Sequence, residues 1–267
     1  MNEWRSYDGV AETYERVHAP RLAEPAKDLV ALAGPPSGGR ILDVGTGTGI
    51  AAAIAREAVG SDGLVVGVDI SLGMLAVGAS ARPSLLLAAA SAIDLPFRDG
   101  TFDVVVASFV LSHFTRYQTA LHDMTRVLRP GGRLAVSAWA ERNTDDLQRT
   151  WLDLVEGVVG QEMLGDVHTQ AVPWGDRFAD RGALEEALIG AGLRRVRTDF
   201  REYHFVYGLD EYVEGLETWS TGRFVSSMLG DASWESFRRQ VRRAFEERFA
   251  DPVNDFRRVW LAVGTKV

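Results

Sequence analysis

The chain has 267 residues, a formal net charge of -8 at pH 7, 46% hydrophobic and 25% charged residues, and no cysteine. This composition is typical of a soluble globular protein, and no apolar run approaches the roughly 20 residues that cross a bilayer. The acidic balance disfavours a nucleic-acid substrate, because its average field repels a phosphate backbone. Without cysteine, disulfides and thiolate metal sites are excluded.

The N-terminal part of the chain predicts two helices. They cover Tyr7–Val17 and Leu22–Leu32 and end at the turn-rich run Gly34–Gly39. We therefore treat residues 1–39 as an N-terminal helical cap.

The next segment predicts a strand, a glycine loop and a helix. The apolar strand Arg40–Val44 carries Asp43 near its end, glycines follow at alternate positions (Gly45, Gly47 and Gly49), and an Ala-rich helix covers Ile50–Val59. Such glycines let the backbone turn tightly against a ligand, and the helix N-terminus attracts negative charge. The loop predicts a nucleotide-like cofactor site, and its alternative role is a purely structural turn.

A second strand, Leu64–Val68, is followed by Asp69, roughly 20 residues beyond the glycines, where a ribose-binding carboxylate belongs. The alternative role of Asp69 is to cap the helix expected at Leu72–Ser80, a role that Ser71 already fills.

The same alternation continues to Trp139. Strands are expected at Leu85–Ala88, Phe102–Ser108 and Leu134–Ala138, with a helix at Gln118–Leu128 that ends in a Pro-Gly-Gly turn. Alternation of this kind predicts a parallel sheet with helices on both faces, and ligands bind beyond the carboxyl ends of its strands. Four polar residues occupy those ends: Asp43, Asp69, Ser91 and Ser108.

Beyond Trp139 the alternation stops. A helix is expected over Asp145–Gly160, an irregular stretch over Gly165–Arg181, a helix over Ala183–Ala191 and a strand over Leu193–Phe205. The segment Leu209–Ala250 is mostly helical, and a last strand covers Arg258–Gly264.

Four of these segments follow one another as in a known family: D-V-G-T-G-T-G at 43–49, the strand ending at Asp69, A-S-A-I-D-L-P-F at 90–97 before F-D-V-V at 102–105, and L-R-P-G-G at 128–132. The chain resembles class I S-adenosylmethionine (SAM) methyltransferases, in particular the methyltransferase type 11 group of the ubiquinone and menaquinone enzymes. The resemblance covers residues 40–139.

This resemblance implies an α/β, Rossmann-like fold with a seven-stranded, mostly parallel sheet and an antiparallel last strand. It also implies a SAM-binding core at 40–142, the remainder of the core with a helical insertion at 143–208, a helical lid at 209–250 and the last strand at 251–267.

The resemblance further implies SAM as cofactor, S-adenosylhomocysteine (SAH) as product and no metal. Ser91 stands where the family usually has an Asp that contacts the adenine amino group, so we expect a weaker hydrogen bond there. Met74 and Ile93 are placed to sandwich the adenine ring, and core packing is the alternative for Met74. The expected cofactor-binding residues are Tyr7, Tyr14, Asp43, Gly45, Thr46, Gly47, Gly49, Asp69, Ile70, Met74, Ser91, Ala92, Ile93 and Ser108.

The expected reaction is transfer of a methyl group to the oxygen or carbon of a small hydrophobic metabolite. The methyl of SAM is already activated, so the protein mainly aligns the acceptor and excludes water. His113, directly after the fourth strand, is the candidate base; its alternative role is packing or a backbone hydrogen bond.

Two other activities are considered: a rearrangement or cyclisation that keeps SAM intact, and a disfavoured nicotinamide oxidoreductase, whose fingerprint requires a glycine at position 50, where this chain has Ile50. We expect a cytoplasmic protein with no nucleic-acid partner and no membrane insertion, and a homodimer stays open.

Overall fold

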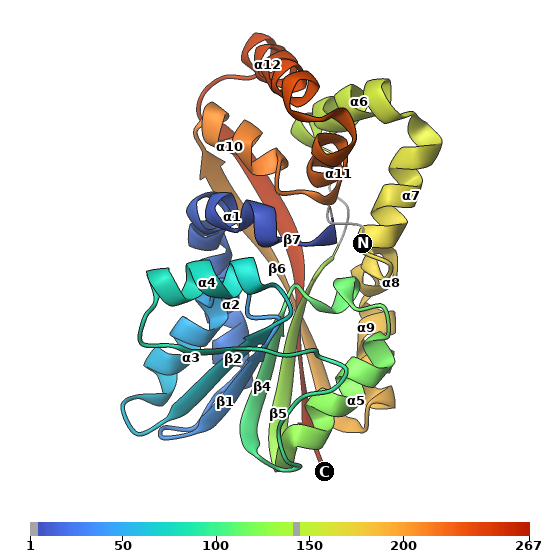
Figure 1. The fold of residues 1–267 in the computed structure, drawn as a ribbon. Helices are drawn as coiled ribbons and strands as arrows, with labels where there is room; N and C mark the ends of the chain where they lie inside the picture. Colours follow the sequence, from blue (N-terminus) through green and yellow to red (C-terminus); the bar gives the residue numbers. More distant parts are fainter. Residues whose placement is uncertain (1–4, 141–144) are drawn as a thin grey trace.

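The computed structural model describes residues 5–140 and 145–267. Seven strands form one sheet in the order β3-β2-β1-β4-β5-β7-β6 (Figure 1). The strands are β1 (Arg40–Val44), β2 (Leu64–Asp69), β3 (Leu86–Ala89), β4 (Phe102–Ser108), β5 (Leu128–Trp139), β6 (Leu193–Tyr207) and β7 (Val253–Lys266). Neighbours from β3 to β5 pair in parallel, whereas β7 pairs antiparallel with both β5 and β6. The expected fold class is confirmed.

Helices cover both faces of this sheet. They are α1 (Ala11–Val17), α2 (Ala19–Ala33), α3 (Ile50–Val59), α4 (Leu72–Ala81), α5 (Tyr117–Val127), α6 (Asp146–Val159), α7 (Gln161–Ala171), α8 (Gly175–Ala179), α9 (Arg181–Gly190), α10 (Leu209–Leu216), α11 (Ser220–Leu229) and α12 (Asp231–Arg248), with short 3-10 turns η2 (Asp8–Val10) and η3 (Leu111–His113). None of the helices within the described ranges has the length and apolarity that a membrane span requires.

Alternate residues of the central strands enter two separate cores. Ile41 and Val104 pack in the core that contains α2 and α3, whereas Leu42 and Val105 pack in the core that contains α5 and α9. Successive strand residues point to opposite faces, so a strand that is apolar at every position is buried on both sides. This explains why the short apolar runs in the sequence predicted the central strands correctly.

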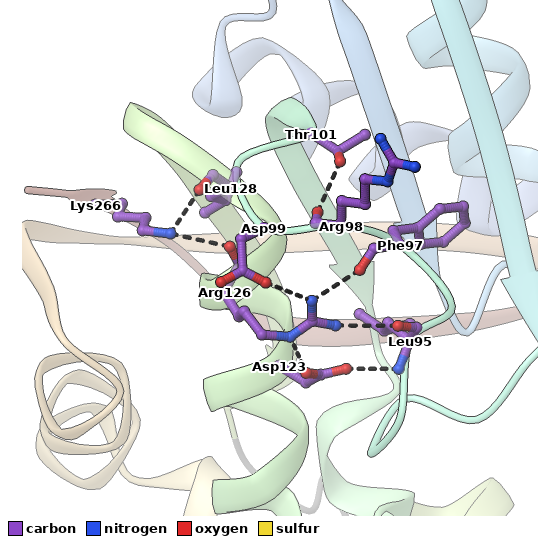
Figure 2. Close-up of polar contacts among 9 residues, drawn as sticks. All are labelled: Leu95, Phe97, Arg98, Asp99, Thr101, Asp123, Arg126, Leu128 and Lys266. Carbon is purple, nitrogen blue, oxygen red and sulfur yellow. Dashed lines mark hydrogen bonds and ion pairs between the residues drawn. The ribbon is translucent and has the colours of Figure 1, made fainter.

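An arginine on α5 anchors the segment that leads into β4. Arg126 donates through Nε to Asp123 at 2.6 Å and through Nη1 to Asp99 at 2.8 Å and to the carbonyl of Phe97 at 2.7 Å (Figure 2). Its Nη2 donates to the carbonyl of Leu95 at 3.0 Å. Leu95, Phe97 and Asp99 precede β4, so the network holds the amino end of that strand. It is therefore structural and lies away from the loops at the carboxyl ends.

Two expectations about local structure are wrong. The stretch Gly165–Arg181 is not irregular, because most of it belongs to α7 and α8. Val167 of α7 and Phe178 of α8 are buried, so tertiary packing outweighs the low helix propensity of the glycines. The Pro-Gly-Gly turn is also absorbed into β5, which begins at Leu128 directly after α5. The chain still bends there, since Gly131 has φ 77°.

The helices expected within Leu209–Ala250 are present as α10, α11 and α12. Together with α6 and α7 they gather at the top of Figure 1, while α1 contacts both α4 and α10. Trp151 of α6 donates through Nε1 to Thr221 of α11 at 2.9 Å and so joins two of these helices. The expected boundary between residues 142 and 143 lies outside the described residues.

Candidate functional site

The glycine loop between β1 and α3 has a left-handed backbone at each glycine. The φ angles are 70° at Gly45, 56° at Gly47 and 94° at Gly49. Residues with a Cβ rarely adopt these angles, which explains why glycine occupies all three positions. The loop is held to β2, because the amides of Gly45 and Thr46 donate to the carbonyl of Val68 at 2.8 and 3.0 Å.

The carboxylate of Asp69 joins the end of β2 to this loop. Its Oδ2 accepts from the amide of Gly47 at 2.8 Å and its Oδ1 from the amide of Ser71 at 2.9 Å. Burial raises the pKa of Asp69, and these hydrogen bonds oppose that rise. Ser71 is the cap of α4, since its Oγ accepts from the amide of Met74 at 3.2 Å. Asp69 therefore stands against the glycine loop, and its role in binding a cofactor stays a prediction.

Asp43 is the buried acid of the site. Its Oδ2 accepts from Oγ1 of Thr46 at 2.6 Å. Burial raises the pKa of Asp43 to about 7, although the Thr46 hydrogen bond lowers it. A carboxyl group in this environment ionises more readily when a cationic ligand group lies beside it.

A cavity opens directly over the loop. Asp43, the loop and Ser108 line it together with Tyr14 and Phe109, and it measures about 50 Å³. Typical small-molecule sites measure roughly 300–1,000 Å³. The side chains over the loop therefore have to move before a ligand as large as SAM can bind.

The other expected cofactor residues lie outside this cavity lining. Ile70 is 80% exposed beside Asp69, whereas Met74 is buried. Ser91 folds back on its own turn, because its Oγ accepts from the amide of Ile93 at 3.4 Å. The structure thus joins Asp43, Gly45, Gly47, Ser108 and Tyr14 around one cavity, whereas Gly49 and Asp69 lie outside its lining. The adenine contacts of Met74, Ser91, Ala92 and Ile93 stay predictions.

The N-terminal segment is tied to the start of α4, next to Asp69. Oδ1 of Asp8 accepts from Oγ of Ser71 at 2.6 Å and from the amide of Gly73 at 2.8 Å. These bonds, led by that from Ser71, lower the pKa of Asp8. On α1, Glu15 pairs with Arg82 at 2.8 Å. Sequence reasoning missed Asp8, because an isolated acid near a helix start has no pattern that marks a distant partner.

His113 lies beneath this N-terminal segment. The ring of Tyr7 is 6.0 Å from the ring of His113 and 6.0 Å from that of Tyr14. Nδ1 of His113 is 3.2 Å from the carbonyl of Ala171. A carbonyl only accepts, so Nδ1 carries the hydrogen and the neutral ring has its lone pair on Nε2. Burial and then the charge of Arg223 lower the pKa of His113 to about 4.

Two aromatic rings and an arginine complete the surroundings of the site. Phe109 stacks on Trp139 with ring centroids 4.1 Å apart. Arg223 of α11 places its Cζ 4.0 Å from the centroid of the Tyr7 ring. The sequence did not single out Arg223, because one arginine in a helical segment has no local signature. No group of three or more His, Cys, Asp or Glu side chains within residues 5–140 and 145–267 could hold a metal ion.

Known proteins match this chain mainly over the sheet that carries the site. A methyltransferase domain family matches residues 42–136. A demethylmenaquinone methyltransferase of Beutenbergia cavernae is 43% identical over 104 residues, which are 39% of this chain and 42% of that protein. A ubiquinone/menaquinone biosynthesis C-methyltransferase of Xanthomonas campestris is 40% identical over 123 residues, 44% of this chain and 49% of that protein. The chain thus spans less than half the length of these relatives.

A solved structure extends the likeness of the fold to most of the chain. The YcgJ protein of Bacillus subtilis has a TM-score of 0.58 and 19% identity, with 91% of this chain and 98% of that chain covered. At this identity the likeness shows the fold alone. Residues 42–136 are therefore similar to a methyltransferase domain, and the two relatives that match part of the chain are named as a demethylmenaquinone methyltransferase and a ubiquinone/menaquinone C-methyltransferase.

Proposed function

We propose that the protein is a SAM-dependent methyltransferase that acts on a small hydrophobic metabolite. The observation that carries this proposal is the convergence of Asp43, the glycine loop and Asp69 around one site in a methyltransferase domain. Carbon or oxygen is the proposed methyl acceptor atom. The Xanthomonas relative is named a C-methyltransferase, which supports carbon.

The residues over the loop fit the parts of SAM. The N-terminus of α3 and the loop amides suit the cofactor's carboxylate, and Asp43 suits its cationic groups. Asp69 can accept from the ribose hydroxyls, and Ser91 from the adenine amino group. Ile70, exposed beside Asp69, offers an apolar surface to the adenine ring. Tyr7 and Tyr14 cover this arrangement from the N-terminal side.

SAM, when bound, supplies a methyl group that is already activated on a sulfonium. The chain has to align the acceptor and exclude water. Nε2 of His113 is proposed to take a proton from the acceptor as its oxygen or carbon becomes nucleophilic. The bond between Nδ1 and the carbonyl of Ala171 holds the ring in the tautomer that this role requires. A pKa of about 4 keeps the ring unprotonated at neutral pH and also makes it a weak base, so this role requires an acceptor whose proton is itself acidic.

The identity of the methyl acceptor cannot be inferred from the relatives, because the matched family segment ends at residue 136, before α6. We propose that α10 to α12 and the N-terminal segment choose the acceptor. Arg16 and Arg21 connect the two parts, since Arg16 Nη1 donates to Glu214 at 2.8 Å and Arg21 Nη2 to Glu211 at 2.6 Å.

The test is SAH formation. The protein is incubated with methyl-labelled SAM and a panel of small phenols, enols and aliphatic alcohols, and SAH is measured by mass spectrometry. We expect acceptor-dependent SAH from the wild-type protein and less from His113→Gln at unchanged SAM affinity. Failure of SAM to bind contradicts the proposal. Conversion of a substrate without SAH formation identifies a rearrangement or cyclisation instead.

A further inference from the structure

The outermost strand β6 has an open edge. It stands at the end of the strand order, and β7 is the one strand that pairs with it among the described residues. The carbonyl of Phe200 accepts from Nη1 of Arg201 at 3.0 Å, and the carbonyl of Val206 accepts from Nη2 of Arg21 at 2.9 Å. Side chains reach these carbonyls because no strand lies beyond β6. An edge of this kind is a template on which a further strand can pair.

Two features limit the regular part of this edge. At its amino end the register with β7 shifts ahead of Arg197, and Arg195 has a left-handed φ of 54°. Such a bulge twists an edge away from a further strand. At its carboxyl end, Arg21 already occupies the carbonyl of Val206. The regular part that remains is residues 197–205.

The charges on this regular part alternate in sign. Arg197, Asp199 and Arg201 follow one another on one face, where Oδ2 of Asp199 lies 3.0 Å from Nη2 of Arg197 and 3.6 Å from Nη2 of Arg201. Phe200 points to the opposite face, is 47% exposed, and has its ring 5.2 Å from that of Trp260. An edge with arginine alone would repel another copy, whereas alternating charges can complement themselves.

Two copies of β6 can pair antiparallel about a two-fold axis at Phe200. Asp199 of each copy then lies directly opposite Arg201 of the other, and the two Phe200 rings meet on the exposed face. Thr198 lies opposite Glu202, so no charge meets its like. An axis at Asp199 or at Arg201 would instead set two identical charges opposite each other, which destabilises a strand pair. The order of charges therefore favours the axis at Phe200.

We propose that the edge of β6 is the interface between two copies of this chain, which pair antiparallel about Phe200 and join their sheets into one. A second copy is the occupant, because the order of charges complements itself under a two-fold axis. The cavity over the glycine loop has no lining residue from β6, so pairing leaves both sites accessible. The proposal is independent of the reaction that the site performs.

The first test reverses the charges at the axis, and sedimentation velocity over the micromolar range measures the assembly. We expect a dimer of the wild-type protein. Asp199→Arg and Arg201→Asp should each raise its dissociation constant by about tenfold or more, because two attractive cross-strand pairs become repulsive. Asp153→Arg on α6 and Arg239→Asp on α12 are the matched controls, since they make the same reversals at exposed positions elsewhere and should leave the dimer unchanged.

The second test mixes the two charge-reversed variants. In a mixed dimer, the Asp199→Arg copy presents two cations and the Arg201→Asp copy presents two anions at the paired positions, so both cross-strand pairs are attractive again. The contact between residues 199 and 201 within each chain stays broken. Recovery of the dimer in the mixture can therefore come only from pairing between copies. Native mass spectrometry identifies the mixed dimer, because the two variants differ in mass.

Circular dichroism shows whether each variant is folded. Phe200→Lys sets two ammonium groups against each other at the axis, and it replaces a charge-reversed variant that does not fold. A wild-type protein that stays monomeric across the micromolar range overturns the proposal. A dimer that the folded edge variants leave intact overturns it as well, and so does a mixture of folded Asp199→Arg and Arg201→Asp proteins that does not recover the dimer.

Discussion

At the scale of single residues, Asp69 has the most direct connection to the proposed cofactor. Replacing it with Ala should weaken SAH binding by roughly 1.5–3 kcal/mol, because hydrogen bonds to a charged group are lost. Asp69→Asn should weaken it less, since the amide oxygen can still accept from Gly47 or Ser71. Calorimetry measures both, with Asp153→Asn on the exposed face of α6 as control. Unchanged affinity in a folded Asp69→Ala variant removes this residue from the site.

Ser91 gives a second test of how the site is aligned with the family. If it faces the adenine amino group, Ser91→Asp restores a charge-assisted hydrogen bond and should tighten SAM binding by roughly 0.5–1.5 kcal/mol. Titration calorimetry of SAM is the measurement, and Ser61→Asp in the turn before β2 adds the same charge elsewhere. Weaker binding by a folded Ser91→Asp variant would show that residue 91 does not meet the adenine.

The acids of the core were predictable because their signal is local. Asp43 and Asp69 each end an apolar strand, and the parallel pairing of β1 with β2 places both ends at one edge of the sheet. Asp8 and Arg223 were not predictable, because their roles depend on partners that are distant in sequence. Asp8 meets Ser71 across 63 positions, and Arg223 meets Tyr7 from the other end of the chain. No periodicity or motif encodes such a contact.

At the scale of elements, the contact between the N-terminal segment and α4 depends on one glycine. A Cβ on Gly73 would lie 2.6 Å from Cα and 2.7 Å from the carbonyl oxygen of Asp8, and backbone atoms cannot yield as a flexible side chain can. Gly73→Ala should therefore displace residues 5–17 and weaken SAH binding severalfold. Alanine also favours a helix by roughly 0.8–1.0 kcal/mol over glycine, so α4 itself should remain intact.

Hydrogen exchange of residues 5–17 and calorimetry with SAH measure this effect. Gly157→Ala is the matched control, because Gly157 lies in α6 and has no atom within 4 Å of an added Cβ. Unchanged exchange and affinity in Gly73→Ala would mean that the N-terminal segment does not cover the cofactor.

Helix α10 contacts α1, and α12 contacts both α10 and α11. If they close over the acceptor together with Tyr7–Val17, both segments should gain protection from hydrogen exchange when SAH and an acceptor bind. The cavity of about 50 Å³ is lined by Tyr14 of the N-terminal segment, so its small volume indicates that ligand entry requires movement of that segment. Equal protection in free and bound protein would make Leu209–Ala250 a static appendage.

Helices and strands were predicted well where the pattern was regular, and poorly where packing decided the outcome. The periodicity of Leu209–Ala250 predicted helices correctly. The stretch Gly165–Arg181 contains two glycines and a proline, and local propensity therefore favoured a loop. Contacts of α7 with α6 and α11 override that propensity, and such contacts are invisible before the fold is known.

At the scale of the whole molecule, Asp43 makes stability depend on pH. Its pKa is about 7 in the folded chain against an ordinary value of 3.8. The unfolded chain therefore releases this proton first, and the contribution of Asp43 to the free energy of unfolding falls as pH rises from about 4 to about 7. His18 and His113 act in the opposite direction, since their pKa values near 4 reduce stability as pH falls below 6.5.

Asp43→Asn isolates the first effect. The free energy of unfolding of wild type minus that of the variant should fall by about 2–3 kcal/mol between pH 5 and pH 7, from roughly 1.4 kcal/mol per unit. Urea denaturation at several pH values measures it, and Asp153→Asn should show no such trend. A difference that does not vary with pH would show that Asp43 is ionised throughout.

The position of β7 determines the order in which the molecule can assemble. It follows every other strand in the chain yet lies between β5 and β6 in the sheet. During synthesis, β5 and β6 lack the strand that pairs between them until Val253–Lys266 has been made. The unpaired edges of such strands favour aggregation. The glycine loop and Asp69 are complete long before that moment. Changes that slow the insertion of β7 should therefore reduce the amount of folded protein recovered from cells, while the molecules that do fold bind SAM normally.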